Sequence, residues 1–297
     1  MKPLLLKSLF FTLIASLARA YDTTVSDLFE QGNEALGSNE ANNLFAAISS
    51  YKTALSLLVS QADNADNMSK DDTEMMLSLY INLGTAYSSV TDAGQEERAI
   101  EAYREALLVH KDYSMDQKNK KNKDLDDLAA QAAFFLGMMY QDTGKYRNAA
   151  DAYAMAGTLD EYHWSALGNL GSVLQDHMKN QGEAMLAYNK AYQIITEDYT
   201  KATDMPENPA PILSQLQYRI GLAINASPGH KCVVQGDDPD TPRDCKELAT
   251  HAFSLATKYD PQNEPAKHML AAITADATMT RASNSYVTSL FDDYAAK

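Results

Sequence analysis

The sequence contains few residues that break helices. Only 13 glycines and nine prolines occur in 297 residues, while alanine, leucine, tyrosine and methionine are plentiful. Beyond the first twenty residues no apolar run approaches the roughly 20 residues that cross a bilayer. Such a composition is typical of a helix-rich chain and differs from that of a disordered chain or a β-sandwich. It therefore predicts an all-α fold.

Basic residues are also scarce. The chain has 25 lysines and arginines against 40 aspartates and glutamates, which gives a net charge of −15. Three of the basic residues lie among the first twenty, so the remainder is more acidic still. Nucleic acids and anionic membranes repel such a chain on average. We expect neither as a partner.

The local motifs of common catalytic and metal sites are missing. Six histidines are scattered, and none belongs to a His-Glu-x-x-His motif or stands beside a serine or cysteine nucleophile motif. There is no glycine-rich phosphate loop, and the aspartates between 237 and 244 lack the spacing of an EF-hand. We therefore predict no catalytic residue, no metal and no cofactor.

The first twenty residues have the pattern of a secretory signal peptide. Lys2 and Lys7 flank the start, an apolar run extends from Leu9 to Leu17, and Ala18 and Ala20 supply the small residues of a cleavage site. An uncleaved signal anchor is the alternative, although the run is short for a membrane span. We predict a signal peptide over 1–20 and a mature chain in the ER lumen or outside the cell.

Two features fit this compartment. Cys232 and Cys245, the only cysteines, bracket a loop rich in turn-forming residues, and an oxidising compartment favours their pairing over two free thiols. Asn67 begins the sequon Asn-Met-Ser and is a candidate glycosylation site.

An internal repeat is the strongest signal in the sequence. Leu136-Gly137 and Leu170-Gly171 stand 34 residues apart, and Leu83-Gly84 and Ile220-Gly221 repeat the motif. Each copy then has an alanine, an aromatic residue four positions on and an alanine three beyond it, which is one face of a helix. Glycine is unfavourable within helices, so its recurrence at one position predicts a close approach of two helices. A weaker first copy contains Gly32, Ala47, Tyr51 and Ala54.

The period and the two-part pattern resemble the tetratricopeptide repeat (TPR) family over roughly Asp27–Gln262. The family's usual tryptophan is absent from its position in every copy, and its proline survives only as Pro261. The resemblance implies a right-handed α-solenoid with about five repeats over 21–262 and a degenerate repeat or capping helices over 263–297. Insertions at 60–74, 111–127, 197–212 and 226–246 are expected to be loops. The lysine-rich insertion 111–127 could dock an acidic partner, but a solvated loop or a fraying helix is expected.

By this resemblance, the first helix of each repeat lines a concave groove that binds a protein or peptide segment, and the chain is a non-catalytic scaffold. The cations that clamp an acidic chaperone tail in other members are missing from the corresponding positions. Asn82 and Asn169 are expected to be exposed in the groove, because a buried unpaired amide is costly. Phe134 and Met138 could equally belong to the core. The predicted groove residues are Asn82, Thr85, Phe134, Met138, Asn169, Ser172, Tyr218 and Arg219.

A second resemblance concerns the C-terminal end. The segment 286–295, Tyr-Val-Thr-Ser-Leu-Phe-Asp-Asp-Tyr-Ala, is similar to the junction of proteins that join TPR arrays to S-adenosylmethionine-dependent methyltransferase domains. The alternative function is therefore the substrate-recruiting arm of such an enzyme, with the catalytic domain absent from this chain.

Overall fold

The computed structural model describes residues 23–38, 41–62, 69–91, 94–116, 121–202, 205–227, 231–232 and 243–274. These residues form eleven helices and two short strands. The helices are α2 (Thr23–Gly37), α3 (Ala41–Ala62), α4 (Lys70–Ser89), α5 (Gln95–Asp116), α6 (Lys123–Asp142), α7 (Tyr146–Leu159), α8 (Trp164–Asp176), α9 (Gln181–Glu197), α10 (Ala210–Asn225), α11 (Cys245–Tyr259) and α12 (Glu264–Thr274).

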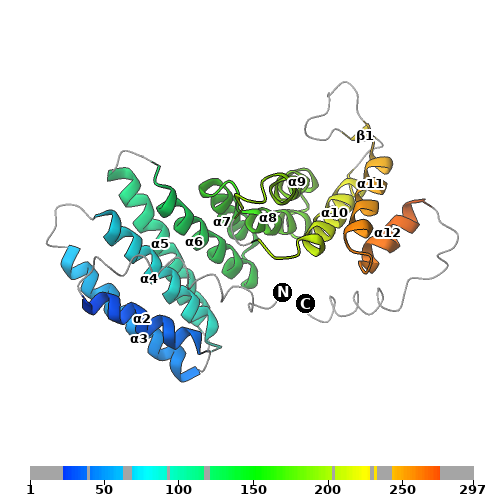
Figure 1. The fold of residues 1–297 in the computed structure, drawn as a ribbon. Helices are drawn as coiled ribbons and strands as arrows, with labels where there is room; N and C mark the ends of the chain where they lie inside the picture. The colour runs from blue at the N-terminus through cyan, green and yellow to red at the C-terminus, as the bar shows by residue number, and fades with distance from the viewer. Residues whose placement is uncertain are drawn as a thin grey trace. The chain divides into compact units, whose positions relative to one another are not determined.

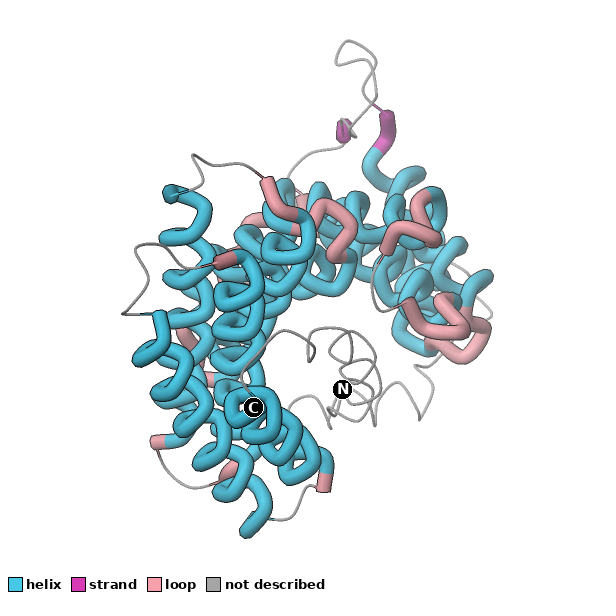
Figure 2. Tube along the Cα trace, turned by 60° about the vertical axis from the view of Figure 1, so that its left-hand side comes forward, coloured by secondary structure: helices cyan, strands magenta, loops and turns pink. Residues whose placement is uncertain are grey.

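The helices form hairpins that follow one another along the chain (Figure 1). The chain divides into two compact units. Unit 1 ends at Glu161 and contains the hairpins α2–α3, α4–α5 and α6–α7. Unit 2 begins at Tyr162 and contains α8–α9 and α10–α11, with α12 packed on α11. Within each unit, the second helix of one hairpin packs on the first helix of the next. The predicted all-α fold of helix–turn–helix repeats is confirmed, and Figure 2 shows how little of the described chain is not helical.

Local sequence sets the bounds of several helices. Ser69 caps α4 by accepting a hydrogen bond from the backbone N–H of Asp72 (3.1 Å), and Asp244 caps α11 in the same way through Lys246 (2.7 Å). Gly144 has φ +71° in the turn between α6 and α7, a conformation that glycine adopts without steric cost.

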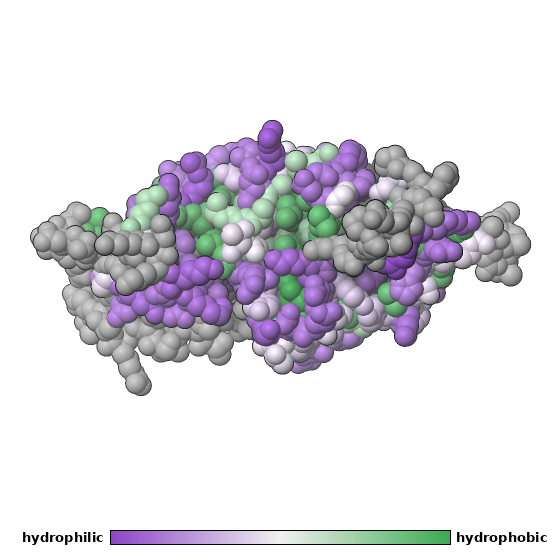
Figure 3. All heavy atoms as spheres, turned by 90° about the horizontal axis from the view of Figure 1, so that it is seen from above, coloured by the Kyte–Doolittle hydropathy of each residue, from purple (hydrophilic) through white to green (hydrophobic). Residues whose placement is uncertain are grey.

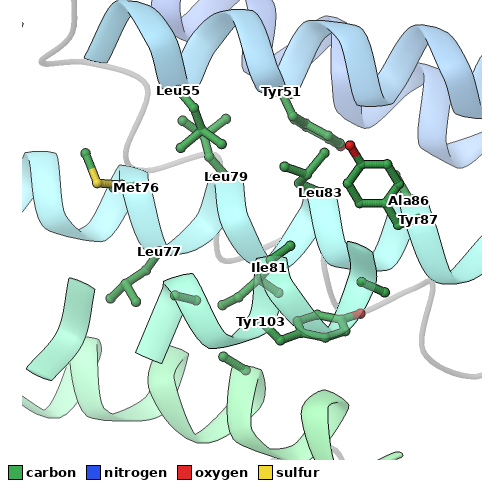
Figure 4. Close-up of a cluster of buried hydrophobic side chains, with 14 of the residues drawn as sticks. Tyr51, Leu55, Met76, Leu77, Leu79, Ile81, Leu83, Ala86, Tyr87 and Tyr103 are labelled. Atoms are coloured by element: carbon green, nitrogen blue, oxygen red, sulfur yellow. The ribbon is translucent and has the colours of Figure 1, made fainter. Parts of the chain in front are cut away.

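The first helix of a hairpin is buried on two sides. In Figure 4, Tyr51 and Leu55 of α3 approach one side of α4, where Leu55 lies beside Leu79, whereas Ile81 points to the other side, toward Tyr103 of α5. All five side chains are at most 7% exposed. A single hairpin cannot bury both sides of its first helix, so the neighbouring hairpin completes the core.

The structure corrects the predicted loop at 111–127. Helix α5 continues to Asp116, and helix α6 begins at Lys123. The extension is helical because Val109 and Tyr113 pack against the core of unit 1. The lysine content of the segment concealed this apolar face.

The predicted disulfide is confirmed. Strands β1 (Lys231–Cys232) and β2 (Arg243–Asp244) pair antiparallel in the loop between α10 and α11, and they bring Cys232 and Cys245 together with Cα atoms 5.1 Å apart. Cys245 is also the first residue of α11, so the bridge fixes the start of that helix to the strand pair.

Three predictions fall outside the described residues: the signal peptide over 1–20, the glycosylation site at Asn67, and the segment 286–295.

Candidate protein-binding surface on the first helices

Two of the predicted groove residues stand two positions before a repeat glycine and reach back to the preceding hairpin. Asn82 of α4 was expected to be exposed, and that expectation is wrong, because the residue is 2% exposed. Its amide donates to Asn33 Oδ1 on α2 (2.8 Å), which also accepts the Tyr51 hydroxyl (2.8 Å). The buried amide is therefore satisfied within the protein and links two hairpins of unit 1.

Arg219 of α10 makes the corresponding link in unit 2. Its Nη1 atom lies 2.9 Å from both carboxylate oxygens of Asp176 at the end of α8. Gln175 donates to the backbone carbonyl of Arg219 (3.2 Å) and is itself 6% exposed. The guanidinium thus has a partner already, and its first role is to hold α10 on α8.

The same position in the third hairpin is Phe135, whose ring lies 5.6 Å from that of Tyr103 in the second hairpin. The position therefore carries an amide, an aromatic ring or a guanidinium, each in contact with the preceding hairpin. Sequence alone could not give this role, because the partners of Asn82 and Arg219 lie more than 40 residues away. Asn169 stands at this position in α8 and is half-buried.

Thr85 and Ser172 directly follow a repeat glycine and contact a buried tyrosine of the same hairpin. Thr85 Oγ1 lies 3.2 Å from the Tyr103 hydroxyl. The Tyr188 hydroxyl donates to Ser172 Oγ (3.3 Å). The two predicted groove hydroxyls are half-buried, and each also donates to a backbone carbonyl of its own helix, Thr85 to Ile81 (3.0 Å) and Ser172 to Gly168 (3.1 Å).

These tyrosines are buried deeply enough to change their acid–base behaviour. Burial raises the pKa of Tyr103 to about 12, and it does so more strongly than the hydrogen bond with Thr85 lowers it. Burial likewise raises the pKa of Tyr188 to about 12 and that of Tyr51 above its usual range. The phenols are therefore neutral hydrogen-bond donors over the physiological pH range.

The remaining predicted groove residues are apolar or aromatic and half-buried. Phe134 lies 5.9 Å from the ring of Tyr153, and Met138 packs against the core of unit 1. Tyr218 lies 6.1 Å from the ring of Phe253 in unit 2. All three belong partly to the core and partly to the surface of the first helices.

One contact recurs in every hairpin. A glycine of the first helix lies directly under an aromatic ring of the second helix, as predicted from its recurrence. A Cβ added at Gly84 would lie 2.6 Å from Tyr103, and one at Gly171 would lie 2.5 Å from Tyr188. The five pairs are Gly32 with Tyr51, Gly84 with Tyr103, Gly137 with Tyr153, Gly171 with Tyr188, and Gly221 with Phe253.

The fold is that of a tetratricopeptide-repeat protein. No protein-family model matches the chain. No curated protein sequence matches it significantly.

Several solved structures are similar to this chain. A MamA protein has a TM-score of 0.47 and 21% identity, over 80% of this chain and 93% of its own. YrrB, described as a TPR protein with an unusual peptide-binding site, has a TM-score of 0.45 and 16% identity, over 79% and 91%. A TPR protein from Parabacteroides merdae has a TM-score of 0.46 and 16% identity, over 85% and 73%. At these values the similarity transfers neither a function nor a binding site to this chain.

Within the described part of the chain, no three histidine, cysteine, aspartate or glutamate side chains are grouped so that they could hold a metal ion. Nor is any described helix both long and apolar enough to cross a membrane.

Proposed function

We propose that the chain is a non-catalytic TPR scaffold that binds a protein or peptide segment on the surface of its first helices. The observation that carries the proposal is that half-buried side chains on this surface are held in place from below. The Thr85 and Ser172 hydroxyls contact buried tyrosines, and Phe134 rests on Tyr153.

Such fixing favours binding because a side chain that is already ordered loses little entropy when a ligand meets it. Phe134, Met138 and Tyr218 supply apolar and aromatic contact area, which usually dominates affinity. Asn169 offers an amide donor and acceptor for a peptide backbone. Asn82 and Arg219 support this surface by linking hairpins and are not primary ligand contacts in this proposal.

We further propose that the scaffold works in the ER lumen or outside the cell. The Cys232–Cys245 bridge supports this location, since disulfides persist in oxidising compartments. The signal-peptide pattern of the first twenty residues points the same way.

A peptide library displayed on phage and selected on the immobilised chain tests the proposed function. The affinity of the selected peptides is then measured by fluorescence anisotropy for Phe134→Leu and Asn169→Ala, one variant for each unit. At least one of them should bind about tenfold more weakly, as expected for a contact residue in an interface.

Leu186→Ser is the matched control, because Leu186 is an exposed apolar residue (45%) on the second helix α9. Circular dichroism confirms that each variant is folded. Failure to select any peptide would refute the proposed binding surface, and so would equal affinity of the two contact variants and the control.

A further inference from the structure

A second candidate binding surface lies on the second helices of the hairpins of unit 1, and it is independent of the proposed function. Helices α5 and α7 are both second helices, and each packs on α6. Between them is an open cavity of about 400 Å³. Its floor is formed by Leu136 and Tyr140 of α6, and its walls by Leu107 and Leu108 of α5 and by Met155 of α7. We call it the α5–α7 groove. Figure 3 shows hydrophobic surface, in green, among hydrophilic side chains on the face seen from above.

The two walls carry exposed apolar side chains, with Leu108 44% and Met155 47% exposed. The repeats themselves show that the fold does not require them. Five positions after the buried aromatic residue, where α5 has Leu108, the other second helices have Ser56, Thr158, Gln193 and Lys258. Two positions after the aromatic residue, where α7 has Met155, the others have Thr53, Glu105, Lys190 and Leu255.

A hairpin therefore tolerates a polar residue at both positions, and often has one. Exposed apolar side chains that gather in one concave place are typical of a binding site rather than of a solvated helix face. In the α5–α7 groove the two apolar residues that differ from the other repeats, Leu108 and Met155, line the same cavity.

The groove has a cationic edge on the α5 side. Arg104 and Lys111 line it together with Leu107 and Leu108, at the i, i+3, i+4 and i+7 spacing of one helix face. Both cations are exposed, and neither forms an ion pair with any residue in the described ranges. His110 also lines the groove, but its Nε2 atom lies 2.8 Å from Asp126 of α6.

The lining of the groove contains Arg104 and Lys111 and no acidic residue, although the chain has 40 acidic and only 25 basic residues. Intramolecular carboxylates are abundant, yet none pairs with them among the described residues. The charge complementarity therefore indicates an occupant that brings its own carboxylates to the α5 side.

We infer that the α5–α7 groove binds an amphipathic peptide helix of a partner protein, with an apolar stripe and carboxylates along one flank. The distance along α5 from Arg104 to Lys111 is about 10 Å at 1.5 Å per residue, so the contact covers about two helical turns. A helix that lays its apolar face between two helices is a common mode of peptide recognition.

The test uses two labelled peptides of about 14 residues and the full chain. Both have leucines at i, i+3, i+4 and i+7. One has glutamates along one flank, and the other has lysines there. Fluorescence anisotropy should show the glutamate peptide binding at least about tenfold more tightly, since each close ion pair and each buried anchor contributes on this scale. Equal affinity for the two peptides, or no binding of either, would overturn the inference.

Variants then locate the site. Leu108→Ser and Met155→Thr install residues that other repeats already carry at these positions, so the fold should be retained, and each should weaken binding of the glutamate peptide about tenfold. Arg104→Glu with Lys111→Glu should abolish the preference for glutamate over lysine. Lys52→Glu is the control, because Lys52 follows Tyr51 as Arg104 follows Tyr103 but lies on α3.

If binding is unchanged in Leu108→Ser and Met155→Thr, the peptide binds elsewhere and the inference fails. Sedimentation of the wild type and Leu108→Ser gives a further check. A self-association that Leu108→Ser removes would show that a second copy of the chain occupies the groove, which also contradicts the inference. Variants Phe134→Leu and Asn169→Ala should leave binding of this peptide unchanged, so the two proposed surfaces can fail separately.

Discussion

The contact between repeat glycine and aromatic ring yields a sharp prediction, namely that Gly171→Ala destabilises unit 2. In an exposed helix this substitution stabilises by about 1 kcal/mol, because alanine is the better helix former. Here the new Cβ would lie 2.5 and 2.6 Å from two ring atoms of Tyr188. The ring cannot swing aside cheaply, since the residue is 1% exposed and its hydroxyl is bonded to Ser172 and Gln175.

Overpacking of a core typically costs about 1–3 kcal/mol. The fixed ring places Gly171 in the upper part of that range, so after the gain in helix propensity we expect a net loss of about 1–2 kcal/mol. Gly182→Ala in α9 is the matched control, because a Cβ there would meet nothing within 4 Å. That substitution should leave the free energy of unfolding unchanged or raise it slightly.

Trp164 makes the measurement local. It is the only tryptophan of the chain, it begins α8, and it packs against the core of unit 2. Urea unfolding followed by its fluorescence therefore reports on the hairpin that carries both glycines. A Tyr188→Leu background removes the rigid ring, and there Gly171→Ala should cost less than in the wild type. Equal stability of Gly171→Ala and Gly182→Ala, or an undiminished cost in the leucine background, would refute the steric explanation.

Three other predictions concern the links within the units. Asn82→Ala should lower the stability of unit 1 by about 1–3 kcal/mol, because it removes a buried hydrogen bond to Asn33. Asn169→Ala, at the same repeat position, should change stability by less than about 0.5 kcal/mol. Thermal unfolding followed by circular dichroism compares the two variants. Reduction of the Cys232–Cys245 disulfide should destabilise the α10–α11 hairpin by about 3 kcal/mol in the chain-entropy model. The loss is measured as a lower urea midpoint in Trp164 fluorescence. An unchanged midpoint would show that the disulfide does not stabilise the hairpin. For Tyr103, a folded pKa of about 12 against the usual 10.0 means that its contribution to stability is complete below pH 10 and falls between pH 10 and 12 by about 1.4 kcal/mol per pH unit. Tyr103→Phe should reduce the slope of the stability profile over this range by that amount, while Tyr51 and Tyr188 continue to contribute to it. A slope unaltered by the substitution would contradict the assignment.

The repeat pattern predicted the fold because its constraints are local. A glycine, an alanine and an aromatic residue at fixed positions define one hairpin, and the contact between Gly84 and Tyr103 joins residues only 19 positions apart. The disulfide was predictable for a similar reason, since two cysteines bracket one short loop in a chain with an apparent signal peptide.

The surface of the first helices was harder to predict. Asn82 has the same sequence signature whether it faces solvent or a partner on α2, and Asn33 gives no sign of accepting its amide. The rule that a buried amide is costly led to the wrong conclusion, because it does not say whether a distant partner exists. The link between Arg219 and Asp176 was missed for the same reason.

The sequence pattern indicated the α5–α7 groove only weakly. Leu108 and Met155 are ordinary in a helical pattern that contains many apolar residues. They become informative only when the second helices are aligned on their buried aromatic residue, which shows polar residues at the same positions in most other repeats. The helical extension of α5 to Asp116 was also needed to bring Lys111 onto the groove, and the lysine-rich composition had suggested a loop there.

Each tyrosine that covers a repeat glycine is hydrogen-bonded to a polar side chain of its own hairpin, which bears on how such a chain could gain or lose repeats. The phenol of Tyr103 finds Thr85 within the hairpin, and in the fifth hairpin, where the ring belongs to Phe253, the residue after the glycine is Leu222 and no hydroxyl has to be satisfied. A whole hairpin can therefore be duplicated or deleted without separating a phenol that covers a repeat glycine from its hydrogen-bond partner. A recombination point inside a hairpin would separate ring from hydroxyl partner, so the junctions between hairpins are the places where crossovers do least harm.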